Sequence, residues 1–186
     1  MKEQHLYFIA IMLPQRINEE IIAFKNDMAL RFQSKKALRT ASHITLKAPF
    51  KMPPAVHGNV LQWFNGMNIT VVPFMQEIKD FGAFSNKHNP VIYVQPVMNS
   101  SLQHLQKEVL QQFSSTFPKE LISRNEYTFS PHITIGYRDL HLQQFKEAWK
   151  EYAAKQYTAL FEVNSFQLLQ HTNGRWNVTG SFLLNR

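Results

Sequence analysis

The sequence has no cysteine, and this absence excludes disulfide bonds, thiolate metal ligands and a cysteine nucleophile. Its six glycines form no glycine-rich loop of the kind that binds nucleoside triphosphates. There is no HExxH pattern, and no two histidines have the i, i+4 spacing of a zinc-binding helix. The sequence therefore predicts a protein that requires no metal ion and no cofactor.

Long hydrophobic runs are also missing. The first apolar stretch, residues 6–13, is far shorter than the roughly 20 residues that cross a membrane as a helix. It follows a lysine, as in a signal peptide, but it has no small-residue cleavage site and is closed by Pro14 and Arg16. We therefore expect a buried first strand in a cytoplasmic protein that does not interact with a membrane.

Negative charge is scarce relative to positive charge. The chain has 20 Lys and Arg against 13 Asp and Glu, which gives a formal net charge of +7. This excess favours anionic partners such as RNA and nucleotides, although it also serves solubility alone. With 44% hydrophobic residues in a chain of 186, the composition predicts one folded domain over residues 1–186, and we expect a monomer.

A histidine-threonine motif occurs twice. His43 and Thr45 belong to the segment SHITLK, and His132 and Thr134 belong to SPHITIGYR. Residues two apart on a β-strand share a face, so each copy presents one imidazole and one hydroxyl on the same side. A chance copy would be a half-exposed histidine beside a threonine favoured by its β propensity. Two copies in matching contexts favour one site that contains both pairs.

Two imidazoles and two hydroxyls suit the cleavage of a phosphate ester without a metal. One imidazole accepts a proton near neutral pH while the other donates one. The hydroxyls of Thr45 and Thr134 donate hydrogen bonds to the non-bridging phosphate oxygens. The residues leave open which histidine is the base, and our preference is His43 as the acid and His132 as the base.

Four residues near the motifs are candidates for substrate binding. Lys47 and Arg138 lie on the motif faces of regular strands, where a cation can neutralise phosphate charge. Phe84 and Tyr137 are candidates for stacking on a base. The alternative for the two basic residues is a solvated strand end, and the alternative for the two aromatic residues is burial in the core.

The periodicity of apolar residues predicts an α+β protein with antiparallel sheets. Strands are expected at 6–13, 39–47, 69–74, 91–97, 127–138, 158–171 and 175–184. Helices are expected at 14–33, 56–67, 100–117 and 142–154. A turn or bulge is expected at 81–84, and Asn173-Gly174 predicts a tight turn between the last two strands.

The paired motif resembles that of the 2H phosphoesterase superfamily, which includes 2′-5′ RNA ligase-like proteins and cyclic nucleotide phosphodiesterases. The resemblance covers nearly the whole chain. It implies two pseudo-symmetric lobes of antiparallel sheet with flanking helices around a central cleft, lined by one motif strand from each lobe. It also implies that His43, Thr45, His132 and Thr134 are the catalytic residues.

The same resemblance implies a reaction. Family members open 2′,3′-cyclic phosphates to 2′-phosphates, and the same arrangement can join RNA ends. The expected partners are RNA ends or small cyclic-phosphate nucleotides. Two alternatives remain open, namely a non-catalytic RNA- or nucleotide-binding module and a phosphodiesterase for a non-RNA cyclic phosphate metabolite.

Overall fold

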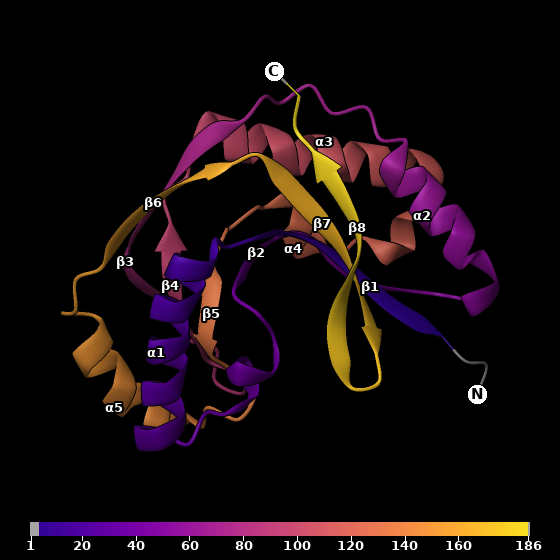
Figure 1. Cartoon of the computed structure of the whole chain (residues 1–186). Coiled ribbons are helices and arrows are strands. Elements are labelled where there is room, and N and C mark those ends of the chain that lie inside the picture. Colours follow the sequence, from indigo (N-terminus) through magenta and orange to yellow (C-terminus); the bar gives the residue numbers. More distant parts are fainter. Residues whose placement is uncertain (1–3, 186) are drawn as a thin grey trace.

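The computed structural model describes residues 4–185, whose strands form two four-stranded antiparallel sheets with helices packed around them (Figure 1). The strand orders are β2-β1-β7-β8 and β5-β4-β3-β6. The strands are β1 (His5–Met12), β2 (His43–Met52), β3 (Phe74–Phe84), β4 (Val91–Pro96), β5 (Ile133–Gly136), β6 (Thr158–Val163), β7 (Ser165–Thr172) and β8 (Arg175–Leu183). The α-helices are α1 (Gln15–Arg31), α2 (His57–Asn65), α3 (Ser100–Thr116), α4 (Arg124–Tyr127) and α5 (Leu142–Tyr152).

The chain builds each lobe around the same three-part unit of strand, helix and motif strand. The units are β1-α1-β2 and β4-α3-β5. In each unit the first strand pairs antiparallel with the motif strand, which is the terminal strand of its sheet. β2 and β5 contact each other, so the two terminal strands meet where the lobes join. The expected α+β fold with two antiparallel lobes is confirmed.

Each unit's helix packs on the motif strand of the other lobe, since α1 contacts β5 and α3 contacts β2. Ile17, Ile21 and Met28 form the buried face of α1, as the helical spacing predicts. The approach of α1 to β5 is close, because a Cβ on Gly136 would lie 2.6 Å from Met28 Cε. The position of each motif strand therefore depends on packing against elements of both lobes.

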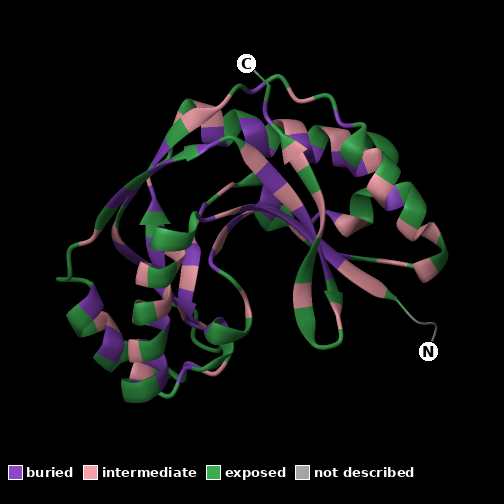
Figure 2. Ribbon diagram, viewed as in Figure 1, coloured by how far each residue is buried: buried purple, intermediate pink, exposed green. Residues whose placement is uncertain are grey.

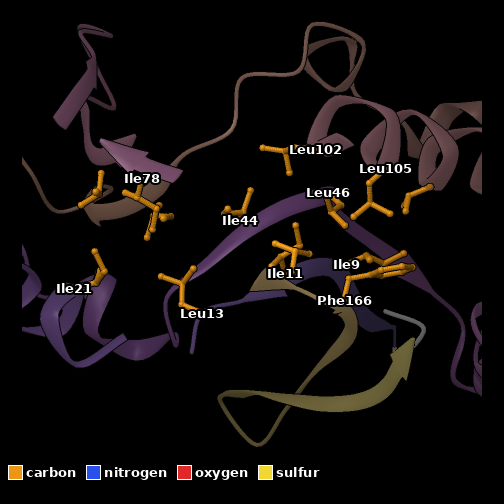
Figure 3. Packing of buried hydrophobic residues seen from close by; sticks show 14 of the residues in the cluster. Ile9, Ile11, Leu13, Ile21, Ile44, Leu46, Ile78, Leu102, Leu105 and Phe166 are labelled. Carbon is orange, nitrogen blue, oxygen red and sulfur yellow. The ribbon is translucent and has the colours of Figure 1, made fainter. Parts of the chain in front are cut away.

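One apolar core spans both sheets, and Figure 2 shows its buried segments along β1, β2 and β7. Ile44 and Leu46 of β2 point into this core between β1 and the residues Leu102 and Leu105 of α3 (Figure 3). Burial of these two side chains anchors one face of the strand. The opposite face, with His43 and Thr45, is thereby turned away from the core.

The predicted strand at 69–74 is wrong. Backbone N–H groups of Thr70 and Val71 donate to the Glu108 carboxylate on α3, so they bond to a side chain and not to a neighbouring strand. The strand begins instead at Phe74 and continues through 81–84, where a turn or bulge was expected. A register shift between Ile78 and Phe81 provides the bulge, but the chain does not turn back there.

The predicted single strand 158–171 is two strands in different sheets, β6 and β7, which are separated at Asn164. The tight turn at Asn173-Gly174 is confirmed, because both residues have the positive φ that such a turn requires, 52° and 74°. No helix within 4–185 combines the length and the apolar character needed to span a bilayer.

Both motif strands differ in extent from the prediction. β2 begins at His43, after a 3₁₀ turn over Lys36–Arg39, and continues past Pro49 to Met52. β5 is short, because Tyr127, assigned to its beginning, is the last residue of α4 and residues 128–132 form neither helix nor strand. α4 has a capping box in which the Ser123 N–H donates to the Glu126 carboxylate. The motif histidine therefore begins one strand and directly precedes the other.

Candidate functional site

The two motif histidines have the same local geometry. His43 Nδ1 lies 2.7 Å from the Ala41 carbonyl oxygen, and His132 Nδ1 lies 2.8 Å from the Ser130 carbonyl oxygen. A carbonyl oxygen only accepts hydrogen bonds, so Nδ1 carries the hydrogen in the neutral form of each ring. Each imidazole is thus fixed by the backbone two residues earlier, and its Nε2 is left as a proton acceptor.

Aromatic rings on the neighbouring strands support both imidazoles. Phe8 of β1 packs on His43 with 4.9 Å between ring centroids, and Tyr93 of β4 packs on His132 at 5.6 Å. Phe84 also contacts the His132 ring, edge to face at 5.2 Å. Each histidine therefore has a backbone tether and an aromatic neighbour. The structure places Phe84, expected to stack on a base, as a packing partner of His132.

A pocket of about 400 Å³ lies where the lobes meet, and it is lined by both motif threonines. Its lining comes from both sheets, the helix α1 and the 3₁₀ turn: Leu6, Phe8, Lys25, Ala37, Thr40, Ser42, His43, Thr45, Pro49, Thr134, Tyr137, Arg138, His171 and Trp176. His132, two residues before Thr134, is not part of this lining, but it lies near enough to His43 for its charge to lower the pKa of that ring. The structure thus brings His43, Thr45 and Thr134 together in one pocket.

The charged side chains that line the pocket are all positive. Its lining includes the cations Lys25 and Arg138 and contains no aspartate or glutamate. Lys25 is only 2% exposed, and its Nζ donates to the Thr40 carbonyl oxygen at 2.9 Å. Burial lowers the pKa of Lys25 to about 8, so the ammonium still carries its charge at neutral pH. Such a lining favours an anionic ligand.

Burial also shifts both motif histidines toward the neutral form. Burial is the main cause that lowers the pKa of His43 to about 4, with smaller contributions from the charges of Lys25 and His132. Burial lowers the pKa of His132 as well, against the opposing hydrogen bond to the Ser130 carbonyl. Both imidazoles are therefore neutral in the free protein at pH 7, and a bound anion would raise their pKa values.

We expect the ring protons of His43 to titrate near pH 4 in NMR spectra, and inorganic phosphate to move this titration to higher pH. The unfolded chain takes up its proton near pH 6.5, so stability is complete above that pH and is lost as the pH falls toward 4. Comparison with a His43→Gln variant identifies the resonance and the part of the pH dependence due to this ring. Titration of His43 near 6.5 in the free protein would contradict the burial that the structure shows.

Tyr137 and Arg138, the two residues that follow β5, both line the pocket. The φ angle of Arg138 is 58°, so this residue leaves the alternation of the strand. Its guanidinium lies over the Tyr137 ring, 5.3 Å from the ring centre. The two candidates therefore reach the pocket together, as a stacked cation and ring at its edge.

The prediction that Lys47 shares the face of His43 is wrong. Ala10 of β1 pairs with Thr45, but Ile9 pairs with Lys47, so β2 contains one extra residue between these two pairs. Such a bulge reverses the alternation, and Lys47 points into the core with no exposed surface. Its Nζ lies 2.9 Å from the Glu126 carboxylate and does not reach the pocket.

Sequence reasoning missed nine residues of the pocket lining, and the five with polar or aromatic side chains that matter most to the site are Phe8, Lys25, Ser42, His171 and Trp176. Trp176 packs edge to face on Phe8 at 4.5 Å, and His171 lies 5.1 Å from the Trp176 ring. This aromatic wall joins β1 to the β7-β8 hairpin, and no local pattern predicts that contact. Lys25 did have a signal, since helical spacing from Ile21 and Met28 places it on the buried stripe of α1.

Replacing Gly82 by alanine is expected to disturb the second motif through Tyr93. A Cβ at position 82 would overlap the Tyr93 ring, which packs on His132. We expect a loss of about 1–3 kcal/mol in unfolding free energy from this overpacking, together with a shift of the His132 ring resonances.

The matched control for this variant is Gly58→Ala on α2, where an added Cβ meets no atom within 4 Å. That change is expected to be neutral or stabilising by up to about 1 kcal/mol. Urea unfolding measures both variants. Equal stability of the two would show that Tyr93 moves aside without cost.

Within residues 4–185, no cluster of three or more His, Asp or Glu side chains is arranged to hold a metal ion. The histidines, threonines and cations of the pocket are donors and proton carriers suited to an oxygen-rich anion. The chemistry that this arrangement supports directly is proton transfer beside a bound phosphate.

Comparison with known proteins gives one family. Residues 13–175 match the family described as the 2′-5′ RNA ligase superfamily. A protein of Geobacillus sp. (strain WCH70), provisionally named a phosphoesterase, is 28% identical over 179 residues, which cover 96% of this chain and 95% of that protein. A protein of Bacillus cytotoxicus with the same provisional name is 28% identical over 162 residues, covering 87% of this chain and 88% of its own length.

Solved structures agree with this assignment at the level of the fold. The crystal structure of E. coli LigT in its apo form has a TM-score of 0.66 at 20% sequence identity and covers 99% of each chain. A crystal structure of a Thermus thermophilus protein also has a TM-score of 0.66, at 18% identity, covering 96% of this chain and 97% of the other.

Proposed function

Because the chain belongs to the 2′-5′ RNA ligase superfamily of 2H phosphoesterases, we propose that it opens 2′,3′-cyclic phosphates of RNA ends or nucleotides to 2′-phosphates without a metal ion. The observation that carries the proposal is the duplicated histidine geometry. Both imidazoles are tethered through Nδ1 to a backbone carbonyl two residues earlier, and the threonine of each motif lines one pocket. The absence of a carboxylate from that lining supports an anionic substrate.

In the proposed reaction, one imidazole takes a proton from water through Nε2, and the resulting hydroxide attacks the cyclic phosphorus. The bond from phosphorus to the ribose 3′ oxygen breaks, and the other imidazole, in its protonated form, donates a proton to that oxygen. Thr45 and Thr134 donate hydrogen bonds to the non-bridging oxygens. The product retains the phosphate on the 2′ oxygen.

We assign the acid role to His43 and the base role to His132. This assignment requires the bound phosphate to raise the pKa of His43 well above the value of about 4 to which desolvation and the charge of Lys25 lower it, because only the protonated ring can donate a proton to the leaving oxygen. If a 5′-hydroxyl takes the place of water, the same steps join two RNA ends by a 2′-5′ linkage.

Nucleotide binding by proteins of this fold supports an RNA-end or nucleotide substrate. E. coli LigT has been crystallised with 3′-AMP and with phosphate, and these structures have TM-scores of 0.65 and 0.64 to this chain at 19% identity. Phe8, Trp176 and Tyr137 give the pocket the aromatic surfaces on which a base or ribose packs.

The test is the hydrolysis of a panel of nucleoside 2′,3′-cyclic phosphates and of an oligonucleotide with a cyclic phosphate end, all in the presence of EDTA. Phosphorus NMR identifies the position of the phosphate in the product. A 2′-phosphate is the expected product, and EDTA is expected to have no effect. A folded protein that turns over none of these substrates would contradict the proposal, and tight nucleotide binding in that case would favour a binding module.

A further inference from the structure

Two buried polar side chains of the pocket take no part in the proposed reaction. Lys25 comes from the middle of α1, and Ser42 immediately precedes His43. Both are 2% exposed, and both belong to the lining that includes His43 and Thr45. Both therefore face the same pocket, and the Nζ of Lys25 donates to the carbonyl oxygen of Thr40, two residues before Ser42 in the sequence.

The Lys25 ammonium has an incomplete set of partners. An ammonium has three N–H donors, and the carbonyl oxygen of Thr40 accepts one of them. Among residues 4–185, no carboxylate lies within ion-pair distance of Lys25 Nζ. A buried charge without a counterion is costly, which is why buried cations are normally paired. The buried Lys47 differs from Lys25, because its ammonium forms an ion pair with the Glu126 carboxylate.

Ser42 Oγ is likewise unpartnered. It is the one buried side-chain oxygen or nitrogen without a hydrogen-bond partner in the described part of the chain. The backbone of the same residue is fully used, since its N–H donates to Asn18 Oδ1 and its carbonyl accepts from the Leu13 N–H. Buried hydroxyls normally have partners, so an unpartnered hydroxyl that lines the same pocket as an ammonium without a counterion points to an acceptor supplied by a ligand.

The pocket has more positive charge than one cyclic phosphate requires. A cyclic phosphodiester carries a single negative charge, and Arg138 and the two motif threonines already offer it a cation and two donors. Lys25 adds a second cation on the α1 side of the pocket, beside the first motif. A ligand that satisfies both cations carries a second anionic group.

We propose that Lys25 and Ser42 form a second anion subsite, which holds a phosphate of the substrate other than the one that reacts. This inference rests on the proposed function and narrows its substrate class to a cyclic-phosphate nucleotide or RNA end with a further phosphate. Two sources share this chemistry: a terminal 5′-phosphate on the same nucleotide and the phosphodiester that precedes the last nucleotide of an RNA chain.

The experiment measures dissociation constants by calorimetry for three product-like probes. The probes are adenosine 2′-monophosphate, adenosine 2′,5′-bisphosphate and a diadenosine with a 2′-phosphate end. The readout is the dissociation constant of the monophosphate divided by that of each of the other two probes. Effects common to all three probes cancel in this ratio. In the native chain we expect a ratio of about ten or more for at least one of the two probes that carry a second phosphate group. The probe that shows it identifies the source of the second phosphate.

Three variants distinguish a role of Lys25 and Ser42 in ligand binding from a role in stabilising the fold. Lys25→Met should bring the ratio close to one, whereas Lys146→Met, which removes a charge from the exposed face of α5, should leave it unchanged. Ser42→Ala should lower the ratio about three- to tenfold without lowering the melting temperature, because the hydroxyl has no partner to lose in the free protein. A purely structural role of Lys25 would change the melting temperature and leave the ratio intact.

The outcomes distinguish the subsite from the reaction. A ratio near one in the native chain, or an unchanged ratio in Lys25→Met, overturns the subsite even if cyclic phosphates are hydrolysed. A ratio that depends on Lys25 supports the subsite even if no cyclic phosphate is turned over, in which case the proposed function alone fails.

Discussion

Alanine at His43 or His132 is expected to lower the turnover of a 2′,3′-cyclic phosphate by about 10²–10⁴-fold, because each change removes one of the two proton-transfer groups. The fold should survive, since both rings are only partly buried and their hydrogen bonds go to the backbone of their own segment. Initial rates and thermal melting of the purified variants measure the two effects separately.

The double variant gives the sharper test. Groups that act as a unit are strongly non-additive, so the variant lacking both histidines should be little worse than the worse single variant. His141→Ala is the matched control, because this histidine is exposed, precedes α5 and lies outside the pocket lining. If either single variant kept its rate within a few-fold of the native protein, the two-imidazole mechanism would be wrong.

The second large effect concerns stability. Glu126→Gln is expected to lower the unfolding free energy by about 3–5 kcal/mol, because it leaves the Lys47 ammonium buried without its counterion. Lys47 has no exposed surface, and its other partners are the carbonyl oxygens of Ala48 and Leu121. Desolvation already lowers the pKa of Lys47, and the Glu126 carboxylate opposes that shift. Urea unfolding at neutral pH measures the loss.

Two further variants show whether the ion pair is the cause. Lys47→Met combined with Glu126→Gln removes the charge along with its partner and should recover part of the loss. Glu151→Gln breaks the exposed ion pair between Arg31 and Glu151, whose side chains are 46% and 48% exposed, and should leave the unfolding free energy nearly unchanged. A loss of less than about 1 kcal/mol in Glu126→Gln would mean that water or a rearranged backbone solvates the lysine.

The motif pairs were predictable because strand alternation is a local rule. Ile44 and Ile133 face the core, so Thr45 and Thr134 face away from it, and this needs no knowledge of the fold. The two lobes followed from a resemblance carried by those same motifs. The sequence did not show at which residue of each strand the regular alternation of faces ends.

Lys47 shows where the local rule ends. It lies two residues beyond Thr45 in the sequence, but one unpaired residue in β2 turns it into the core. The bulge is a property of the pairing with β1, and the sequence of β2 carries no glycine that would mark it. The aromatic wall was hidden for a similar reason, because Phe8 and Trp176 meet only after the β7-β8 hairpin has paired with β1.

Lys25 was missed because a lysine in a helix is usually placed at the surface. Its position between Ile21 and Met28 on the buried stripe contradicted that expectation and was the available signal. A polar residue at a core position of an amphipathic helix is therefore informative about a site, since the cost of its burial requires a local reason.

The position of the motif strands at the ends of their sheets has a consequence for association between molecules. A terminal strand offers unpaired backbone groups to which another chain can add, and this is a common route to aggregation. Here β2 and β5 face each other, Pro49 has no N–H to offer, and the N–H of Ala48 is bonded to Glu126. The free edge of β2 is thus poorly suited to strand addition, while the pocket lined by Thr45 and Thr134 remains accessible to a small ligand.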